Sequence, residues 1–148
     1  MEISLATEAD AVAWLELRLA LWPGNRREEF VGEIAQLLAD PGDTINLIAR
    51  SDNGEAIGLA EAALRHDYVN GCETSPVAFL EGIYVSPNYR RSGVGRRLVD
   101  RIAEWAVERG CTEFASDADI DNAVSHAMHN ALGFAETQRV VYFRKVLD

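Results

Sequence analysis

The segment Ile83-Tyr-Val-Ser-Pro-Asn-Tyr-Arg-Arg-Ser-Gly-Val-Gly-Arg-Arg-Leu-Val99 decides the fold. An apolar strand runs into a turn that contains Gly93 and Gly95, and the turn opens directly into an amphipathic helix. Glycines let the backbone approach a ligand closely, and the first N–H groups of a helix point outward without partners. The segment therefore predicts an anion-binding turn at the start of a helix.

Positive charge concentrates in the same segment. The chain carries 14 lysines and arginines against 24 aspartates and glutamates, a net charge of −10. Five of the basic residues lie here: Arg90, Arg91, Arg96, Arg97 and Arg101. A solvated helix face would account for the last three, but it does not explain two glycines that follow two arginines. The acidic remainder of the chain disfavours nucleic acid and anionic membranes as partners, and it favours a cationic small molecule.

The chain is expected to form one domain over residues 1–148. Its length lies in the usual range for a single domain, and its 48% apolar content is that of a globular protein. Cys72 and Cys111 are far apart in the sequence, which favours reduced thiols over a metal site. The N-terminus has no signal-peptide pattern, and no apolar run approaches the ~20 residues of a membrane span. These features predict a cytoplasmic protein.

Hydrophobic periodicity and turn residues predict an α/β fold, a mixed central β-sheet flanked by helices in the order β-α-α-β-β-β-α-β-α-β. The expected strands are 2–6, 44–50, 55–64, 78–85, 112–116 and 137–147. Thr7 and Asp10 form a capping pattern before the first helix, and the other helices are expected at 27–39, 93–108 and 121–132. The apolar side of the first helix is expected to carry Val12, Leu15, Leu19 and Trp22. Residues 78–117 form a parallel unit, and the polar segment 65–76 is a long loop of the kind that often carries function.

Three phosphate-binding motifs compete for the glycine turn. A P-loop requires a lysine after its last glycine, and the only lysine of the chain is Lys145. A dinucleotide fingerprint requires a third glycine where Leu98 stands. What remains is Arg90-x-x-Gly93-x-Gly95, which resembles the R/Q-x-x-G-x-G/A signature of the GNAT acetyltransferases. Asn122 and Leu132-Gly-Phe134 resemble a second segment of that superfamily, which implies acetyl-CoA as the co-substrate.

A narrower resemblance covers nearly the whole chain. Its segments are Leu21-Trp-Pro-Gly24, Arg65-His-Asp-Tyr-Val-Asn-Gly-Cys72, Phe79-Leu-Glu-Gly-Ile-Tyr-Val85, Ala115-Ser-Asp117 and Ala131-Leu-Gly-Phe134. These segments resemble the short, single-domain aminoglycoside 6'-N-acetyltransferases. The resemblance implies a homodimer that transfers acetyl from acetyl-CoA to the 6'-amine of aminoglycoside antibiotics, and so confers resistance.

The resemblance also implies roles for individual residues. Positions that match the family's substrate contacts are Trp22, Tyr68, Glu81 and Asp117. Positions that match its acetyl-CoA contacts are Ile83, Tyr84, Val85, Arg90, Arg91, Ser92, Gly93, Val94, Gly95 and Asn122. The chain departs from the family in the last expected strand, where relatives carry an acidic substrate contact and this chain has Gln138, with Glu136 two residues earlier. Either residue is a candidate contact at the rim, which puts drug preference in doubt.

The residues themselves support this reading and leave some alternatives. Glu81 interrupts an apolar strand, where a carboxylate is rarely buried without a partner, so it is either a site residue or half of an ion pair. Asp117 follows the next strand, at the end where open α/β sheets bind ligands, or it caps the following turn. Trp22 is a core or a site residue, and Tyr68 is expected to be exposed as a wall for a sugar ring.

The expected chemistry is acetyl transfer to an amine. Glu81 is assigned to position and deprotonate the ammonium, directly or through water, with Asp117 as an electrostatic anchor. A backbone N–H near Val85 is the expected donor to the oxyanion. Many GNAT enzymes carry a tyrosine as the general acid where this chain has His129. The imidazole is a candidate for that role, but contact of a helix-face histidine with the core or solvent is the favoured reading, so His129 is not assigned to catalysis. The alternatives are a GNAT enzyme for another amine, such as a polyamine, an amino acid or a protein N-terminus, and a non-catalytic module that binds acetyl-CoA.

Overall fold

The structure, a computed structural model, describes all residues from Met1 to Asp148 and centres on one five-stranded sheet. The strands lie in chain order: β1 (Glu2–Leu5), β2 (Thr44–Arg50), β3 (Ala56–Arg65), β4 (Val77–Val85) and β5 (Phe114–Ala115). The pairs from β1 to β4 are antiparallel, whereas β4 and β5 are parallel. A parallel pair needs a crossover connection, which a helix provides here. The mixed sheet and the parallel unit predicted for residues 78–117 are therefore confirmed.

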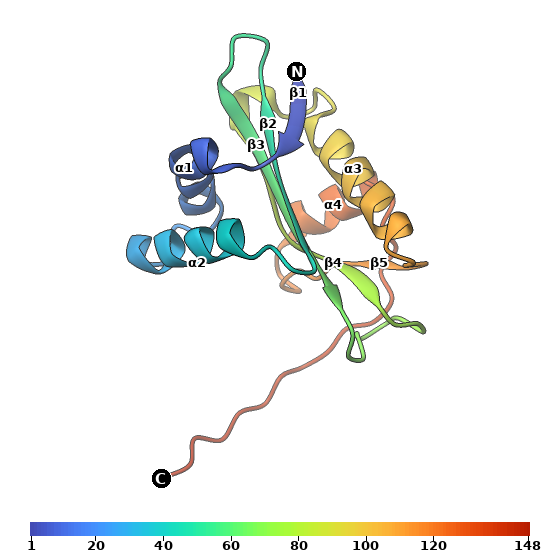
Figure 1. Cartoon of the computed structure of the whole chain (residues 1–148). Helices are drawn as coiled ribbons and strands as arrows, with labels where there is room; N and C mark the ends of the chain where they lie inside the picture. Colours follow the sequence, from blue (N-terminus) through green and yellow to red (C-terminus); the bar gives the residue numbers. More distant parts are fainter.

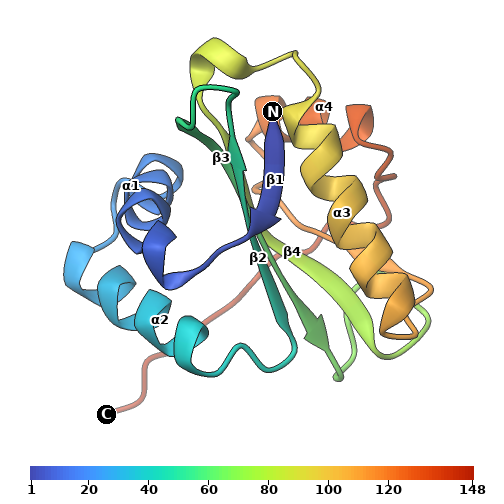
Figure 2. The same cartoon turned by 45° about the horizontal axis from the view of Figure 1, so that its top comes forward.

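Helices cover both faces of the sheet. A short 3₁₀ helix, η1 (Glu8–Asp10), leads into α1 (Ala11–Leu21), and α1 and α2 (Arg27–Ala39) lie on one face (Figure 1). On the other face, η2 (Pro87–Tyr89) precedes α3 (Val94–Glu108), and α4 (Ala123–Ala131) lies beside it (Figure 2). The bounds of α2 and β2 are those predicted from the flanking Pro-Gly pairs and the apolar pattern. None of the helices has both the length and the apolar character that crossing a membrane requires.

Apolar side chains fill both layers between helices and sheet. The larger cluster lies under α3 and includes Leu98, Ile102 and Trp105, as the helical spacing predicts. The smaller cluster lies under α1 and α2 and includes Phe30 and Ile34. The two clusters pack against opposite faces of the sheet.

The buried side of α1 differs from the prediction. Val12 is exposed, whereas Trp14 and Leu17 are buried. Apolar residues occur nearly all round this helix, so their spacing does not tell which stripe faces the sheet. The capping pattern before the helix is confirmed, because Oδ2 of Asp10 accepts hydrogen bonds from the backbone N of Thr7 at 2.8 Å and from its Oγ1 at 3.2 Å.

The strand predicted for residues 137–147 is absent, which corrects the expected order of elements. Residues 135–148 form neither helix nor strand and leave the body as an extended chain, which we call the tail (Figure 1). Its exposed apolar side chains are Val140, Val141, Tyr142, Phe143, Val146 and Leu147. A strand needs a neighbour for its backbone hydrogen bonds, and the course of the tail away from the sheet gives it none. β5 also differs from the prediction, because it pairs with β4 at two positions only and so has two residues.

Candidate active site

The glycine turn has the backbone geometry of an anion site. Gly93 has φ +87°, in the left-handed region, and it precedes the first residue of α3. Arg91 also has positive φ, at +62°. No N–H group from Arg91 to Arg96 donates a hydrogen bond to another protein atom, so these donors are free at the positive end of the helix dipole. Such an arrangement binds phosphate groups.

The arginines around this turn have no acidic partners. Elsewhere in the chain, arginines pair with carboxylates at seven positions: Arg18, Arg26, Arg27, Arg50, Arg65, Arg109 and Arg139. The hydrogen bonds of the five arginines from Arg90 to Arg101 go to backbone carbonyls only: Nε of Arg90 donates to the carbonyl of Val85 at 2.8 Å, and Arg96 and Arg97 donate to the carbonyls of Ala131 and Met1. Their charge is therefore not neutralised within the protein, as an anionic ligand requires.

The strand that leads to the turn is open on one side. β5 pairs with β4 only at Ala78 and Phe79, so the edge of β4 beyond Leu80 has no strand beside it. Ile83, Tyr84 and Val85 are half-buried along this edge. These three residues, which were predicted to contact acetyl-CoA, therefore lie outside the β4–β5 ladder.

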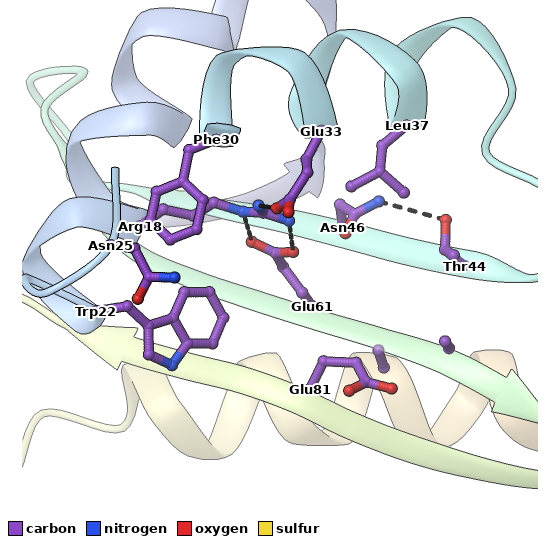
Figure 3. Close-up of a pocket in the computed structure, with 12 residues that line it drawn as sticks. Arg18, Trp22, Asn25, Phe30, Glu33, Leu37, Thr44, Asn46, Glu61 and Glu81 are labelled. Carbon is purple, nitrogen blue, oxygen red and sulfur yellow. Dashed lines mark hydrogen bonds and ion pairs between the residues drawn. The ribbon is translucent and has the colours of Figure 1, made fainter. Parts of the chain in front are cut away.

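A cavity of about 430 Å³ lies on the face of the sheet that α1 and α2 cover, opposite to α3. It lies between α1, α2 and strands β2 to β4 (Figure 3). Trp22 and Glu81, two of the predicted substrate contacts, both line it. Glu33 and Glu61 add two more carboxylates, against one cation, Arg18. This acidic lining suits a cationic ligand.

The floor of the cavity is a buried ion pair. Arg18 and Glu61 are both buried, and Nε and Nη2 of the arginine reach the two carboxylate oxygens at 2.7 and 2.5 Å. Nη1 of Arg18 reaches Glu33, and Nε1 of Trp14 donates to Glu61 at 2.9 Å. Burial lowers the pKa of Arg18, but the hydrogen bonds and charges of Glu61 and Glu33 more than offset this, so its pKa lies above the usual value. The pair is fixed in its charged form.

Glu81 owes its position to a β-bulge. Glu61 pairs with Gly82 and Ala62 pairs with Leu80, so Glu81 is an extra residue in β4. The side chain is 37% exposed and forms an ion pair with Arg65, whose Nη2 lies 3.0 Å from both carboxylate oxygens. Both readings of Glu81 from the sequence therefore hold at once: it lines the cavity, and it belongs to an ion pair.

Trp22 packs on the residue that follows the bulge. A side-chain carbon on Gly82 would lie 2.6 Å from Cη2 and Cζ2 of Trp22, so only glycine allows this contact. The indole also lies 5.9 Å from the ring of Phe30 and 5.8 Å from the guanidinium of Arg18. Trp22 is thus half core and half cavity wall.

The structure does not bring the other predicted substrate contacts into this cavity. Tyr68 is exposed in the loop after β3, and Asp117 is exposed two residues after β5. Glu136 and Gln138 are exposed at the start of the tail. Glu136 pairs with Arg139, and that hydrogen bond lowers the pKa of Glu136 below its usual value.

Two further residues have structural contacts. The Oδ1 of Asn122 accepts from the backbone N of Ser125 at 3.1 Å, so this predicted acetyl-CoA contact caps α4. Nδ1 of His129 lies 2.7 Å from the carbonyl of Ser125, and its Nε2 lies 2.7 Å from Oγ of Ser116. Because a carbonyl only accepts, Nδ1 carries the proton and Nε2 accepts from the serine. His129 thereby ties α4 to the segment after β5.

Sequence reasoning missed three charged residues of the cavity region: Arg18, Glu61 and Arg65. For Glu61 the signal was present, because it is the only charged residue between Ala56 and Leu64, the same pattern that singled out Glu81. Arg18 lies two residues from Glu16 in the first helix, so its charge alone does not mark it as buried. Arg65 is the first residue of the polar segment 65–76 in the sequence, and nothing there marks it as a partner of Glu81.

Comparison with known proteins agrees with this geometry. The model of the Acetyltransferase (GNAT) family matches residues 11–134, so the chain belongs to the GNAT acetyltransferases. Its relatives within that family include the aminoglycoside N(6')-acetyltransferases type 1 of Acinetobacter haemolyticus, 52% identical over the full length of both chains, and of Serratia marcescens, 53% identical over 91% of this chain and 92% of that one.

Solved structures show the same similarity. The apo crystal structure of the aminoglycoside antibiotic 6'-N-acetyltransferase from Acinetobacter haemolyticus superposes with a TM-score of 0.94, at 52% identity and full coverage of both chains. AAC(6')-Iy in complex with the bisubstrate analogue CoA-S-monomethyl-acetylneamine has a TM-score of 0.92 and 41% identity, and the match covers 99% of this chain and 98% of that one. The fold predicted from the glycine turn is confirmed.

Proposed function

We propose that this chain transfers the acetyl group of acetyl-CoA to the 6'-amino group of aminoglycoside antibiotics and so confers resistance to them. The observation that carries the proposal is the course of β4. The strand holds Glu81 at an acid-lined cavity and ends four residues later beside a turn of unpaired arginines and free N–H groups. A cationic acceptor and an anionic donor can therefore meet along one short strand.

The donor, acetyl-CoA, is assigned to the turn. The N–H groups from Arg91 to Gly95 and the charges of Arg90 and Arg91 suit its pyrophosphate. The open edge of β4 at Ile83 to Val85 suits the extended pantetheine arm, which needs backbone partners. Asn122 remains a candidate contact through its amide nitrogen, since its oxygen caps α4.

The acceptor is assigned to the region around Glu81. Trp22 supplies an apolar wall, and Tyr68 and Asp117 are proposed to contact the sugar rings from the loop after β3 and from the end of β5. Glu136 and Gln138 are the proposed rim contacts. Glu136 already pairs with Arg139, so Gln138 is the freer of the two.

The reaction needs two proton movements. The ammonium of the acceptor must lose a proton before its nitrogen attacks the thioester carbon, and the departing thiolate must gain one. Glu81, directly or through water, takes the first proton and positions the amine, while Asp117 attracts it. A backbone N–H near Val85 donates to the oxyanion of the tetrahedral intermediate. The N–C bond forms first and gives the tetrahedral intermediate, and the C–S bond breaks when this intermediate collapses. The proton that the attacking nitrogen loses at this stage passes to the departing thiolate, which gives the amide and CoA.

We further infer that two copies form a dimer through the tail. Six large apolar side chains on one extended segment are an unusual exposure for a monomer. An extended segment of this kind adds readily to an exposed sheet edge, such as that of β5. Light scattering should give twice the mass of one chain, and deletion of residues 135–148 should give the single mass. A full-length protein of single mass would exclude the dimer.

A cytoplasmic location is part of the proposal, because Cys72 and Cys111 are free thiols in the structure and a reducing compartment keeps them so.

The deciding experiment follows thiol release from acetyl-CoA with a panel of amines. An aminoglycoside with a 6'-amine should be acetylated, whereas a drug with a 6'-hydroxyl should bind through its other ammonium groups and inhibit competitively. Turnover of the 6'-hydroxyl drug would exclude 6' selectivity. Turnover of polyamines or amino acids alone would point to another amine, and binding of acetyl-CoA without turnover would point to a non-catalytic module.

A further inference from the structure

Arg65 is the last residue of β3, and its side chain turns back along the sheet instead of continuing into the loop. Its guanidinium carbon lies 3.5 Å from the centre of the Phe79 ring. The same guanidinium forms an ion pair with Glu81. Its Nη2 lies 3.0 Å from both carboxylate oxygens, and its Nε lies 3.3 Å from one of them. The guanidinium therefore contacts both oxygens of the Glu81 carboxylate.

This position conflicts with the proposed role of Glu81. A carboxylate that binds an incoming ammonium must present its negative charge, but here a fixed cation neutralises it. A second cation beside the same carboxylate would also meet the repulsion of Arg65. Because 44% of the Arg65 side chain is exposed and the loop begins at the next residue, the guanidinium has room to leave.

We propose that Arg65 is a built-in competitor for the acceptor site: its guanidinium occupies Glu81 in the free enzyme and must leave before an ammonium group binds there. The inference rests on the proposed function of Glu81 and adds to it a residue that sets the affinity for every cationic acceptor. A competitor within the chain weakens every cationic acceptor by the same factor.

The variant Arg65→Gln tests this directly, with an aminoglycoside and a sugar that carries one amine, such as 6-amino-6-deoxyglucose, as the two acceptors. We expect the KM values of both acceptors to fall by a similar factor of about two-fold to five-fold, the range of exposed ion pairs. The kcat and the KM of acetyl-CoA should stay near the wild-type values, because Arg65 has already left Glu81 when the acceptor is bound. Arg65→Lys keeps the charge but loses the two-pronged contact, so its KM should lie between those of the wild type and Arg65→Gln.

Arg109→Gln is the matched control. Arg109 has the same 44% exposure, lies over the ring of Trp105 and pairs with Asp43 at 3.6 Å. The substitution changes the net charge equally and touches neither Glu81 nor the cavity, so its KM values should be those of the wild type.

Three results would overturn the inference. A higher KM in Arg65→Gln would show that Arg65 holds Glu81 or the acceptor in place. A lower KM in Arg65→Gln for the aminoglycoside alone would show that the arginine stays on Glu81 and repels the acceptor. An equal decrease of both KM values in Arg109→Gln would show an effect of net charge. If the wild-type protein acetylates no aminoglycoside, it is the proposed function that fails.

Discussion

Glu61 holds Arg18 by both carboxylate oxygens, and this pair is buried at the base of the cavity, with Trp14 as a third partner. The pair joins α1 to β3 across 43 residues of chain. Removing one partner of a buried pair destabilises the protein more than replacing both partners with apolar residues, because the remaining charge cannot reach water.

Arg18→Met should therefore lower the free energy of unfolding by about 3–5 kcal/mol, the usual cost of an unpaired buried charge. The double variant Arg18→Met with Glu61→Leu should recover most of the loss. Arg27→Met breaks an exposed pair with Glu16 and should cost no more than about 1 kcal/mol. Urea unfolding measures all three, and a double variant no more stable than Arg18→Met would contradict the argument.

Glu81→Gln should lower kcat for the aminoglycoside by about 100-fold or more, because the amide cannot accept the proton of the ammonium. The KM of acetyl-CoA should not change, since the turn is untouched. Steady-state kinetics with both substrates gives the answer, with Glu104→Gln, an exposed acid on α3, as the control. An unchanged kcat/KM would reduce Glu81 to a structural residue.

Gly93→Ala and Gly110→Ala make a pair that separates strain from function. The two glycines have nearly equal φ, +87° and +85°, and open space around them. Each substitution should cost about 1–2 kcal/mol of stability through left-handed strain. Only Gly93→Ala should raise the KM of acetyl-CoA, because its methyl group stands where phosphate approaches. Calorimetric binding of acetyl-CoA to Gly93→Ala with wild-type affinity would count against the anion site.

Gly82→Ala should displace Trp22, because the new methyl group would lie 2.6 Å from the indole. We expect a loss of about 1–3 kcal/mol from overpacking, together with a higher KM for the aminoglycoside. Gly32→Ala, in α2 with open space around it, should instead add about 0.5–1 kcal/mol. If Gly82→Ala leaves the KM of the acceptor unchanged, Trp22 is not a wall of the acceptor site.

Asp10 should make stability depend on pH in acid. Burial raises its pKa, but hydrogen bonds from Arg50 and Thr7 more than offset this, so the folded pKa lies below the ordinary value of 3.8. A depressed carboxyl pKa means that the contribution is complete above pH 3.8 and is lost as the pH falls through the folded pKa. The difference in unfolding free energy between wild type and Asp10→Asn should thus be constant at neutral pH and shrink in acid. A difference independent of pH down to full acid unfolding would contradict this assignment.

Local signals predicted most of the elements. Pro-Gly pairs and capping residues mark the ends of helices whatever lies across the core, so α2 and α3 fall where the sequence places them. The glycine turn could also be predicted, because its arginines and glycines lie within one short segment. Contacts between segments that are distant in the sequence have no such local signal. The pairs Arg18–Glu61 and Arg65–Glu81 depend on strand register and on one bulge, and neither follows from the composition of a strand.

The tail shows the other limit of prediction. The β-branched and aromatic residues from Val140 to Phe143 do predict a strand, but a strand needs a neighbour to pair with, and the sequence does not show where that neighbour lies.

If the tail of one copy completes the sheet of another, the amount of assembled enzyme is tied to how much chain a cell makes. Well below the dissociation constant of the dimer, the concentration of dimer rises with the square of the chain concentration. Protection would then respond more steeply than in proportion to gene dosage. A two-fold rise in the amount of chain would then raise the amount of dimer by up to four-fold.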